Sequence, residues 1–106
     1  MKQIYRQGDV LIIKLDRAPD GEWSEVPRDN GRVVLAYGEL TGHSHAIAAK
    51  TATLKSSKAT EDRLLEVGGA VILGHEEHDP IKLTKGIYLV RRQREYTPER
   101  IVTVAD

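Results

Sequence analysis

Apolar residues in this chain occur in runs of strand length, and this pattern constrains the fold more than any other feature. The clearest runs cover residues 10–13, 33–35, 71–73 and 87–90. Runs this short, bounded by turn residues, suit strands better than helices. Val, Ile and Thr together supply 24 of the 106 residues, and nine glycines interrupt the chain. Because β-branched residues favour strands and glycines favour tight turns, the sequence predicts an all-β fold.

The apolar runs and the turn residues between them predict about eight strands. Their expected ranges are residues 9–15, 32–37, 43–49, 51–55, 63–67, 70–73, 86–95 and 100–104. Residues 16–31 contain two prolines and two glycines, so we expect a long surface loop there. Many short strands in a chain of this length predict one antiparallel β domain over residues 1–106, either a small barrel or a two-sheet roll.

Local sequence also predicts two strand pairings. Gly68 and Gly69 separate two apolar runs, and glycines tolerate the positive φ angles of a tight turn. Residues 63–67 and 70–73 are therefore expected to form a β-hairpin. A short helix over residues 58–67, ended by Gly68, is the alternative. Residues 51–55 are expected to return as the partner of the strand that begins at His43.

The charge balance argues against several classes of partner. Sixteen Lys and Arg offset sixteen Asp and Glu, so no general attraction to nucleic acid or to an anionic membrane is expected. The basic segment over residues 91–94 would be divided between two faces of a strand. The N-terminal residues carry no apolar signal segment, and no apolar run could span a membrane, which predicts a cytoplasmic protein.

All four histidines lie in two short motifs, Gly42-His43-Ser44-His45 and Gly74-His75-Glu76-Glu77-His78. On a strand, His43 and His45 point to the same face, so both rings can reach one ion. Histidine is the commonest metal ligand, and the chain has no cysteine to supply a thiolate. We therefore predict a site for zinc, iron(II), nickel or copper, with His43, His45, His75 and His78 as ligands. Surface histidines that bind no metal are the alternative.

The His75-x-x-His78 spacing imposes a condition on the backbone. Residues three apart on a strand face opposite sides, so both rings reach one site only if the chain turns between them. Pro80 shortly after the second histidine favours such a turn. His75 is thus the expected third ligand, and His78 is either a fourth ligand or a group that faces a substrate.

Carboxylates near the histidines are candidates for a catalytic role. Glu39 shares the glycine-bounded turn before His43 and is the preferred ligand, imidazole partner or general base. Glu76 and Glu77 are equally well explained as solvated loop acids. Tyr96 is the candidate hydrogen-bond donor in the same cavity, with packing at its rim as the alternative.

Three longer motifs occur together in this chain: GELTGHSH at residues 38–45, HEEHDPIKL at residues 75–83 and GIYLVRRQREY at residues 86–96. With the segment Gln7-Gly8-Asp9, they resemble a group of small bacterial and phage-encoded proteins that have no established activity. This resemblance implies a compact β domain. The His-x-His pair is also similar to the first motif of cupins, which implies a metal-binding β-barrel. Where that motif carries a glutamate, this chain has Ala49 and Lys50.

Two functional hypotheses follow from these features. The first is a metal-dependent enzyme acting on a small molecule, with an open coordination position that activates water or oxygen or polarises a carbonyl. The second is a non-enzymatic binding or interaction module with a structural or sensory metal, or with no metal at all. A small-molecule ligand and a homo-oligomer are compatible with both hypotheses, whereas membrane and nucleic-acid partners are not expected.

Overall fold

The computed structural model describes residues 3–37, 43–92, 94–96 and 101–103, and these residues form twelve β-strands. The strands are β1 (Ile4–Gln7), β2 (Val10–Leu15), β3 (Trp23–Glu25), β4 (Val33–Tyr37), β5 (Ser44–Ile47), β6 (Ala52–Ser57), β7 (Arg63–Val67), β8 (Val71–Leu73), β9 (Ile81–Leu83), β10 (Gly86–Arg92), β11 (Arg94–Tyr96) and β12 (Ile101–Thr103). The described residues contain no helix, which confirms the all-β prediction. This part of the chain accordingly offers no helix that could cross a membrane.

Six of the strands form one antiparallel sheet in the order β1-β2-β10-β7-β6-β3. In its middle, β10 pairs with β2 and β7, in registers that bring Leu89 opposite Ile13 and Leu64. The other strands form three two-stranded sheets, β4-β5, β8-β9 and β11-β12. Among the described strands, β1 and β3 remain the edges of the large sheet, so it does not close into a barrel. The arrangement is compatible with the two-sheet roll.

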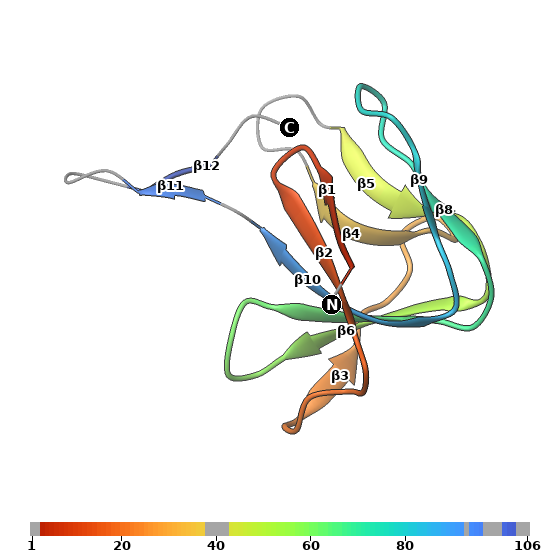
Figure 1. Ribbon diagram of the computed structural model, residues 1–106, viewed down its shortest axis with the longest axis vertical. Coiled ribbons are helices and arrows are strands. Elements are labelled where there is room, and N and C mark those ends of the chain that lie inside the picture. The colour runs from red at the N-terminus through yellow and green to blue at the C-terminus, as the bar shows by residue number, and fades with distance from the viewer. Residues whose placement is uncertain (1–2, 38–42, 93, 97–100, 104–106) are drawn as a thin grey trace.

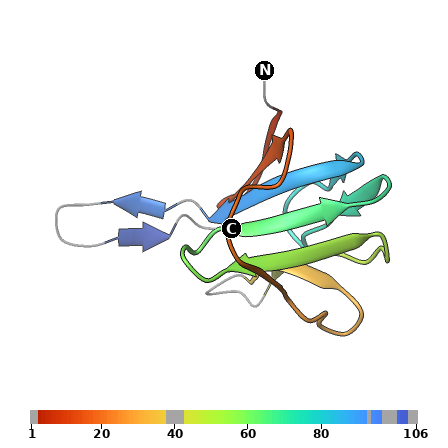
Figure 2. The ribbon, with the colours of Figure 1, turned by 90° about the horizontal axis from the view of Figure 1, so that it is seen from below.

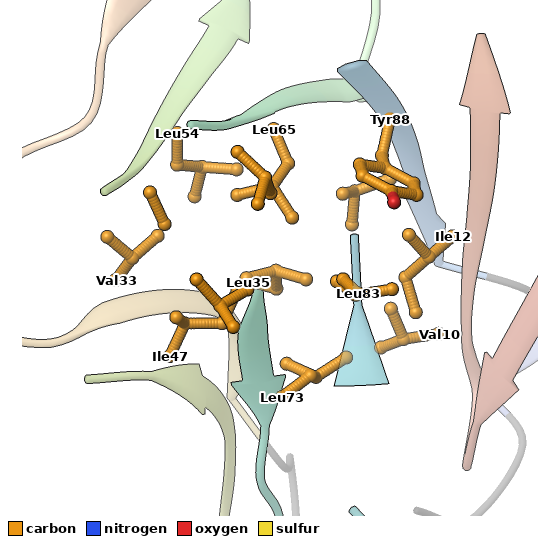
Figure 3. Packing of buried hydrophobic residues seen from close by; sticks show 14 residues of the cluster. Val10, Ile12, Val33, Leu35, Ile47, Leu54, Leu65, Leu73, Leu83 and Tyr88 are labelled. Carbon is orange, nitrogen blue, oxygen red and sulfur yellow. The ribbon is translucent and has the colours of Figure 1, made fainter. Parts of the chain in front are cut away.

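The core is aliphatic and lies between the large sheet and the small sheets β4-β5 and β8-β9. Figure 3 shows Leu54, Leu65 and Tyr88 of the large sheet facing Leu35 and Leu83 of the small ones. Each of these side chains is at most 3% exposed. The Tyr88 hydroxyl donates a hydrogen bond of 2.6 Å to the Thr84 carbonyl, which satisfies the only polar atom of the side chain.

Both pairings predicted from local sequence are wrong. β7 and β8 form no hairpin, because β6 and β10 occupy the two edges of β7. Gly68 and Gly69 instead carry the chain from the large sheet to β8, and the Gly68 N–H donates to the Thr51 carbonyl at 2.9 Å. The alternative helix over residues 58–67 is also wrong, since β7 occupies its second half. β6 pairs with β3 and β7, whereas the histidine strand β5 pairs with β4.

The described strands outnumber the eight expected because several contain only three or four residues. β1 precedes the first predicted strand, β3 lies within the expected loop over residues 16–31, and β9 follows the second histidine motif. The long strand predicted over residues 86–95 is divided into β10 and β11. β11 pairs with β12, and Figures 1 and 2 show this pair extending away from the other sheets.

Candidate metal centre

A backbone bridge between β5 and the residue after β8 brings the two histidine motifs together. Ala46 and Gly74 exchange two hydrogen bonds, with N–O distances of 3.0 and 2.9 Å. In an antiparallel register, the residue before one partner lies opposite the residue after the other, so His45 lies opposite His75. One position further on, the Ser44 N–H donates to Glu76 Oε1 at 3.0 Å. Two segments far apart in the sequence therefore build one site.

The four histidine rings, here called the histidine cluster, meet around His75. Its ring centroid lies 5.6 Å from that of His43, 4.3 Å from that of His45 and 4.6 Å from that of His78. The chain bends over residues 76–78, and this bend lets His75 and His78 approach each other despite their spacing. A ring nitrogen of each histidine is shielded from solvent. The cluster is thus partly enclosed by the protein.

The turn between β1 and β2 adds two buried polar side chains to the histidine cluster. Gln7 pairs with Val10, so Gly8 and Asp9 form a two-residue turn. Gly8 has a φ of 59°, a left-handed conformation that glycine adopts without steric cost. Gln7 is only 2% exposed and Asp9 only 1%. Burial of an amide and a carboxylate is costly unless both have polar partners or a bound ion.

Gln7 fixes the tautomer of His45. The Gln7 amide nitrogen donates to the carbonyls of Leu73 and Asp79, at 3.1 and 3.0 Å. Since carbonyls only accept, the Gln7 oxygen must be the atom that faces His45 Nδ1 at 2.8 Å. Nδ1 therefore carries the proton, and in the neutral ring the lone pair lies on Nε2. A ring held in this way is prepared to bind a cation through Nε2.

Asp9 lies on the Nε2 side of His45 and is anchored from its other side by Arg92. Arg92 Nε donates to Asp9 Oδ2 at 2.6 Å, and a terminal nitrogen of Arg92 donates to the Tyr37 carbonyl. Asp9 Oδ1 lies 3.7 Å from His45 Nε2, which is longer than a hydrogen bond. Within the described part of the chain, Oδ1 has no hydrogen-bond partner.

The solvent side of the site contains three potential ligands that converge, here called the outer ligand group: His43, His75 and Glu76. One ligand atom from each lies within 4.8 Å of the other two. The Ser44 N–H and the backbone N–H of Glu76 itself lower the pKa of the Glu76 carboxyl, and nearby His43 and His75 lower it further. Glu76 is therefore a carboxylate that can bind a cation. Glu77 Oε1 lies 3.3 Å from His43 Nδ1 and adds a second negative charge.

His75 is held in the opposite tautomer to His45. The Glu77 N–H donates to His75 Nδ1 at 3.0 Å, so the proton of the neutral His75 ring lies on Nε2. A metal ion needs a lone pair on the nitrogen that it binds. His75 can therefore join an ion as a neutral ligand only if this hydrogen bond opens.

The structure brings the four predicted histidines together and places other residues around them than the sequence analysis named. Glu39 lies outside the described residues. Tyr96 lies in β11, within the pair of strands that extends away from the other sheets, and its side chain is not described. Glu76, for which the sequence leaves a solvated loop acid and a ligand as alternatives, belongs to the outer ligand group. The sequence predicts no role for Gln7 or Asp9, because it places Asp9 at the start of a strand. Gly8, between two strand-forming segments, is the sequence signal for the hairpin turn that carries both residues.

A cleft of about 700 Å³ shares Arg92 with this network. Its lining also includes Leu35, Tyr37 and Val90, together with charged residues of the β6-β7 connection. None of the four histidines is among its described lining residues. The cleft therefore lies beside the histidine cluster and shares Arg92 with its polar network.

Comparison with known proteins gives one match. The model of a family described as a domain of unknown function, DUF8820, matches residues 6–93. No curated protein and no solved structure matches the chain. The matched span contains Gln7, Asp9, Arg92 and the whole histidine cluster, and it ends before β11.

Replacing Gln7 by leucine should destabilise the protein. The change removes an amide that serves two backbone carbonyls and the His45 N–H, leaving buried polar groups without partners. Unsatisfied buried groups cost about 1–3 kcal/mol each, so we expect a loss of about 2–4 kcal/mol in the free energy of unfolding. Urea denaturation of Q7L and wild-type protein measures this loss.

Q3L is the matched control, because Gln3 is exposed and its side chain accepts a hydrogen bond from the Tyr5 hydroxyl, away from the histidine cluster. Its stability should stay within about 0.5 kcal/mol of the wild type. Equal effects of Q7L and Q3L would contradict the role given to Gln7.

Proposed function

This chain belongs to the DUF8820 family, and we propose that its histidine cluster binds one divalent transition-metal ion. The observation that carries the proposal is the gathering of all four histidines of the chain at one point, from two distant segments. A group of imidazoles and acidic side chains does not stabilise an aliphatic core. This combination of nitrogen and oxygen donors does match the ligands that proteins use for zinc, iron(II), nickel or copper.

Two further features of the site support the proposal. His78 Nε2 is buried and has no hydrogen-bond partner within the described residues, so a bound cation would satisfy it. The Gln7 hydrogen bond orients His45 in the manner of a supporting contact behind a metal ligand. Nitrogen and oxygen donors without thiolate leave several borderline metals as candidates.

Binding should rearrange the bend over residues 76–78. His75 gains a free Nδ1 only when its hydrogen bond from the Glu77 N–H opens. The outer ligand group would then tighten from the separations of up to 4.8 Å seen here, since zinc ligands lie about 2.0–2.2 Å from the ion.

Untagged protein should bind one equivalent of Zn²⁺ per chain. Isothermal titration calorimetry and elemental analysis after dialysis measure the stoichiometry. H43A and E76Q should each weaken binding by about 10-fold or more, because each removes a member of the outer ligand group.

E66Q is the matched control for E76Q. Glu66 is also a partly exposed carboxylate, but it lies on β7 and pairs with Lys55 at 3.2 Å. E66Q should bind Zn²⁺ like the wild type. A wild-type protein that retains less than about a tenth of an equivalent, after incubation with zinc and with iron(II), would refute the proposal.

A metal-dependent enzyme is the second candidate, and the exposure of the outer ligand group favours it. The His43 side chain is 28% exposed and Glu76 is exposed, so an ion held there could also bind water or a small molecule. A structural ion is instead normally enclosed by four protein ligands.

The visible spectrum of the Co²⁺-loaded protein separates these alternatives. An open site should bind azide, and the absorption bands should shift as azide is added, because a new ligand enters the coordination sphere. Bands that stay unchanged up to high azide concentration would indicate a closed site and a binding module.

A further inference from the structure

Asp9 is a buried carboxylate with only one of its two oxygens hydrogen-bonded within the described residues. Its side chain is fully enclosed, and Oδ2 accepts a hydrogen bond of 2.6 Å from Arg92. Oδ1 is also buried but has no hydrogen-bond partner in the part of the chain that the structure describes. Burying a carboxylate oxygen without a hydrogen-bond donor destabilises the folded state. We therefore expect Oδ1 to have a donor or a cation as its partner.

We propose that Asp9 Oδ1 is a ligand of the ion at the histidine cluster and binds it together with His45 Nε2. This inference rests on the proposed function and adds a carboxylate from the β1-β2 turn to the histidines. Gln7 holds His45 so that its lone pair lies on Nε2, and this atom lies 3.7 Å from Oδ1. Two atoms that both accept are thus close to each other inside the protein.

The distance between these two atoms suits a shared ion better than a shared proton. An N–H···O hydrogen bond spans about 2.7–3.2 Å, so one proton does not bridge 3.7 Å. Two zinc ligands at about 2.1 Å from the ion are about 3.4 Å apart at a tetrahedral angle and about 4.2 Å apart on opposite sides. The observed separation falls between these values.

Arg92 determines how Asp9 can bind. Because its guanidinium group donates to Oδ2, only Oδ1 is left for a cation, and the carboxylate is restricted to binding through one oxygen. The second hydrogen bond of Arg92, to the Tyr37 carbonyl, keeps the pair fixed. Arg92 is thus a positioning residue. A site with imidazole and carboxylate donors favours zinc, iron(II) or nickel over copper(I).

The test compares Zn²⁺ affinity of D9N and wild-type protein by competition with a chelating dye. The D9N amide can still accept from Arg92 through its oxygen, but the NH₂ group that faces His45 cannot bind a cation. We expect D9N to weaken Zn²⁺ binding by at least about 10–100-fold. The Co²⁺ spectrum of D9N should also differ from that of the wild type, a change that a purely structural role of Asp9 would not produce.

D62N is the matched control. Asp62 also accepts hydrogen bonds from an arginine of β10, with both oxygens held by Arg91 at 3.1 and 2.9 Å, but it lies outside the histidine cluster. The Zn²⁺ affinity of D62N should equal that of the wild type. If D9N binds Zn²⁺ like the wild type while H43A is impaired, the role of Asp9 is refuted and the metal site stands. If the wild type binds no metal, both proposals fail.

D9E provides the test if D9N does not fold. The longer side chain keeps its charge but moves the oxygen relative to His45. The Co²⁺ absorption bands of D9E should shift and its Zn²⁺ affinity should fall. Bands and affinity identical to those of the wild type would refute a bond between Asp9 and the ion.

Discussion

The side chain of Gln7 is the contact on which the rest of the site depends. Its carboxamide joins the β1-β2 turn to the end of β8, to the segment after the histidine bend and to His45. Both N–H groups are directed at carbonyls, so the amide cannot turn over without bringing acceptors together. One side chain therefore fixes the position of the bend and the orientation of the most deeply buried histidine.

A row of buried polar groups extends from this contact and lies next to the aliphatic core. The row runs from Gln7 through His45 and Asp9 to Arg92. The aliphatic residues between the sheets form a hydrophobic core that does not include these polar groups. Buried polar networks are costly when a member lacks a partner. A cation bound between His45 and Asp9 would account for a network that packing alone does not explain.

The fold class could be predicted, and the four histidines could be named as candidate ligands, because both inferences depend on local patterns. Short β-branched runs indicate strands, and alternate residues such as His43 and His45 face the same side. The strand pairings could not be predicted, because they depend on which distant edges are free. Gly68 and Gly69 are typical of a hairpin turn. However, β7 already pairs with β6 and β10, so the chain after Gly69 continues into another sheet.

The supporting residues of the site were missed for the same reason. Asp9 and Gln7 belong to a turn whose partners lie more than 30 residues away along the chain, and no local pattern indicates those contacts. The Ala46–Gly74 bridge distinguishes Glu76 from Glu77, because it brings the Glu76 carboxylate to the Ser44 N–H. Spacing identified candidate ligands, whereas the sheet register determines which of them lie close together.

Long-range ¹H–¹⁵N NMR spectra of the histidine rings test the central claim most directly, because they report tautomer and metal binding at each nitrogen. Without metal, His45 should show a protonated Nδ1 and an unprotonated Nε2. Added Zn²⁺ should shift the Nε2 signal while the Nδ1 proton remains. A protonated Nε2 on His45, or histidine signals that Zn²⁺ leaves unchanged, would contradict the account.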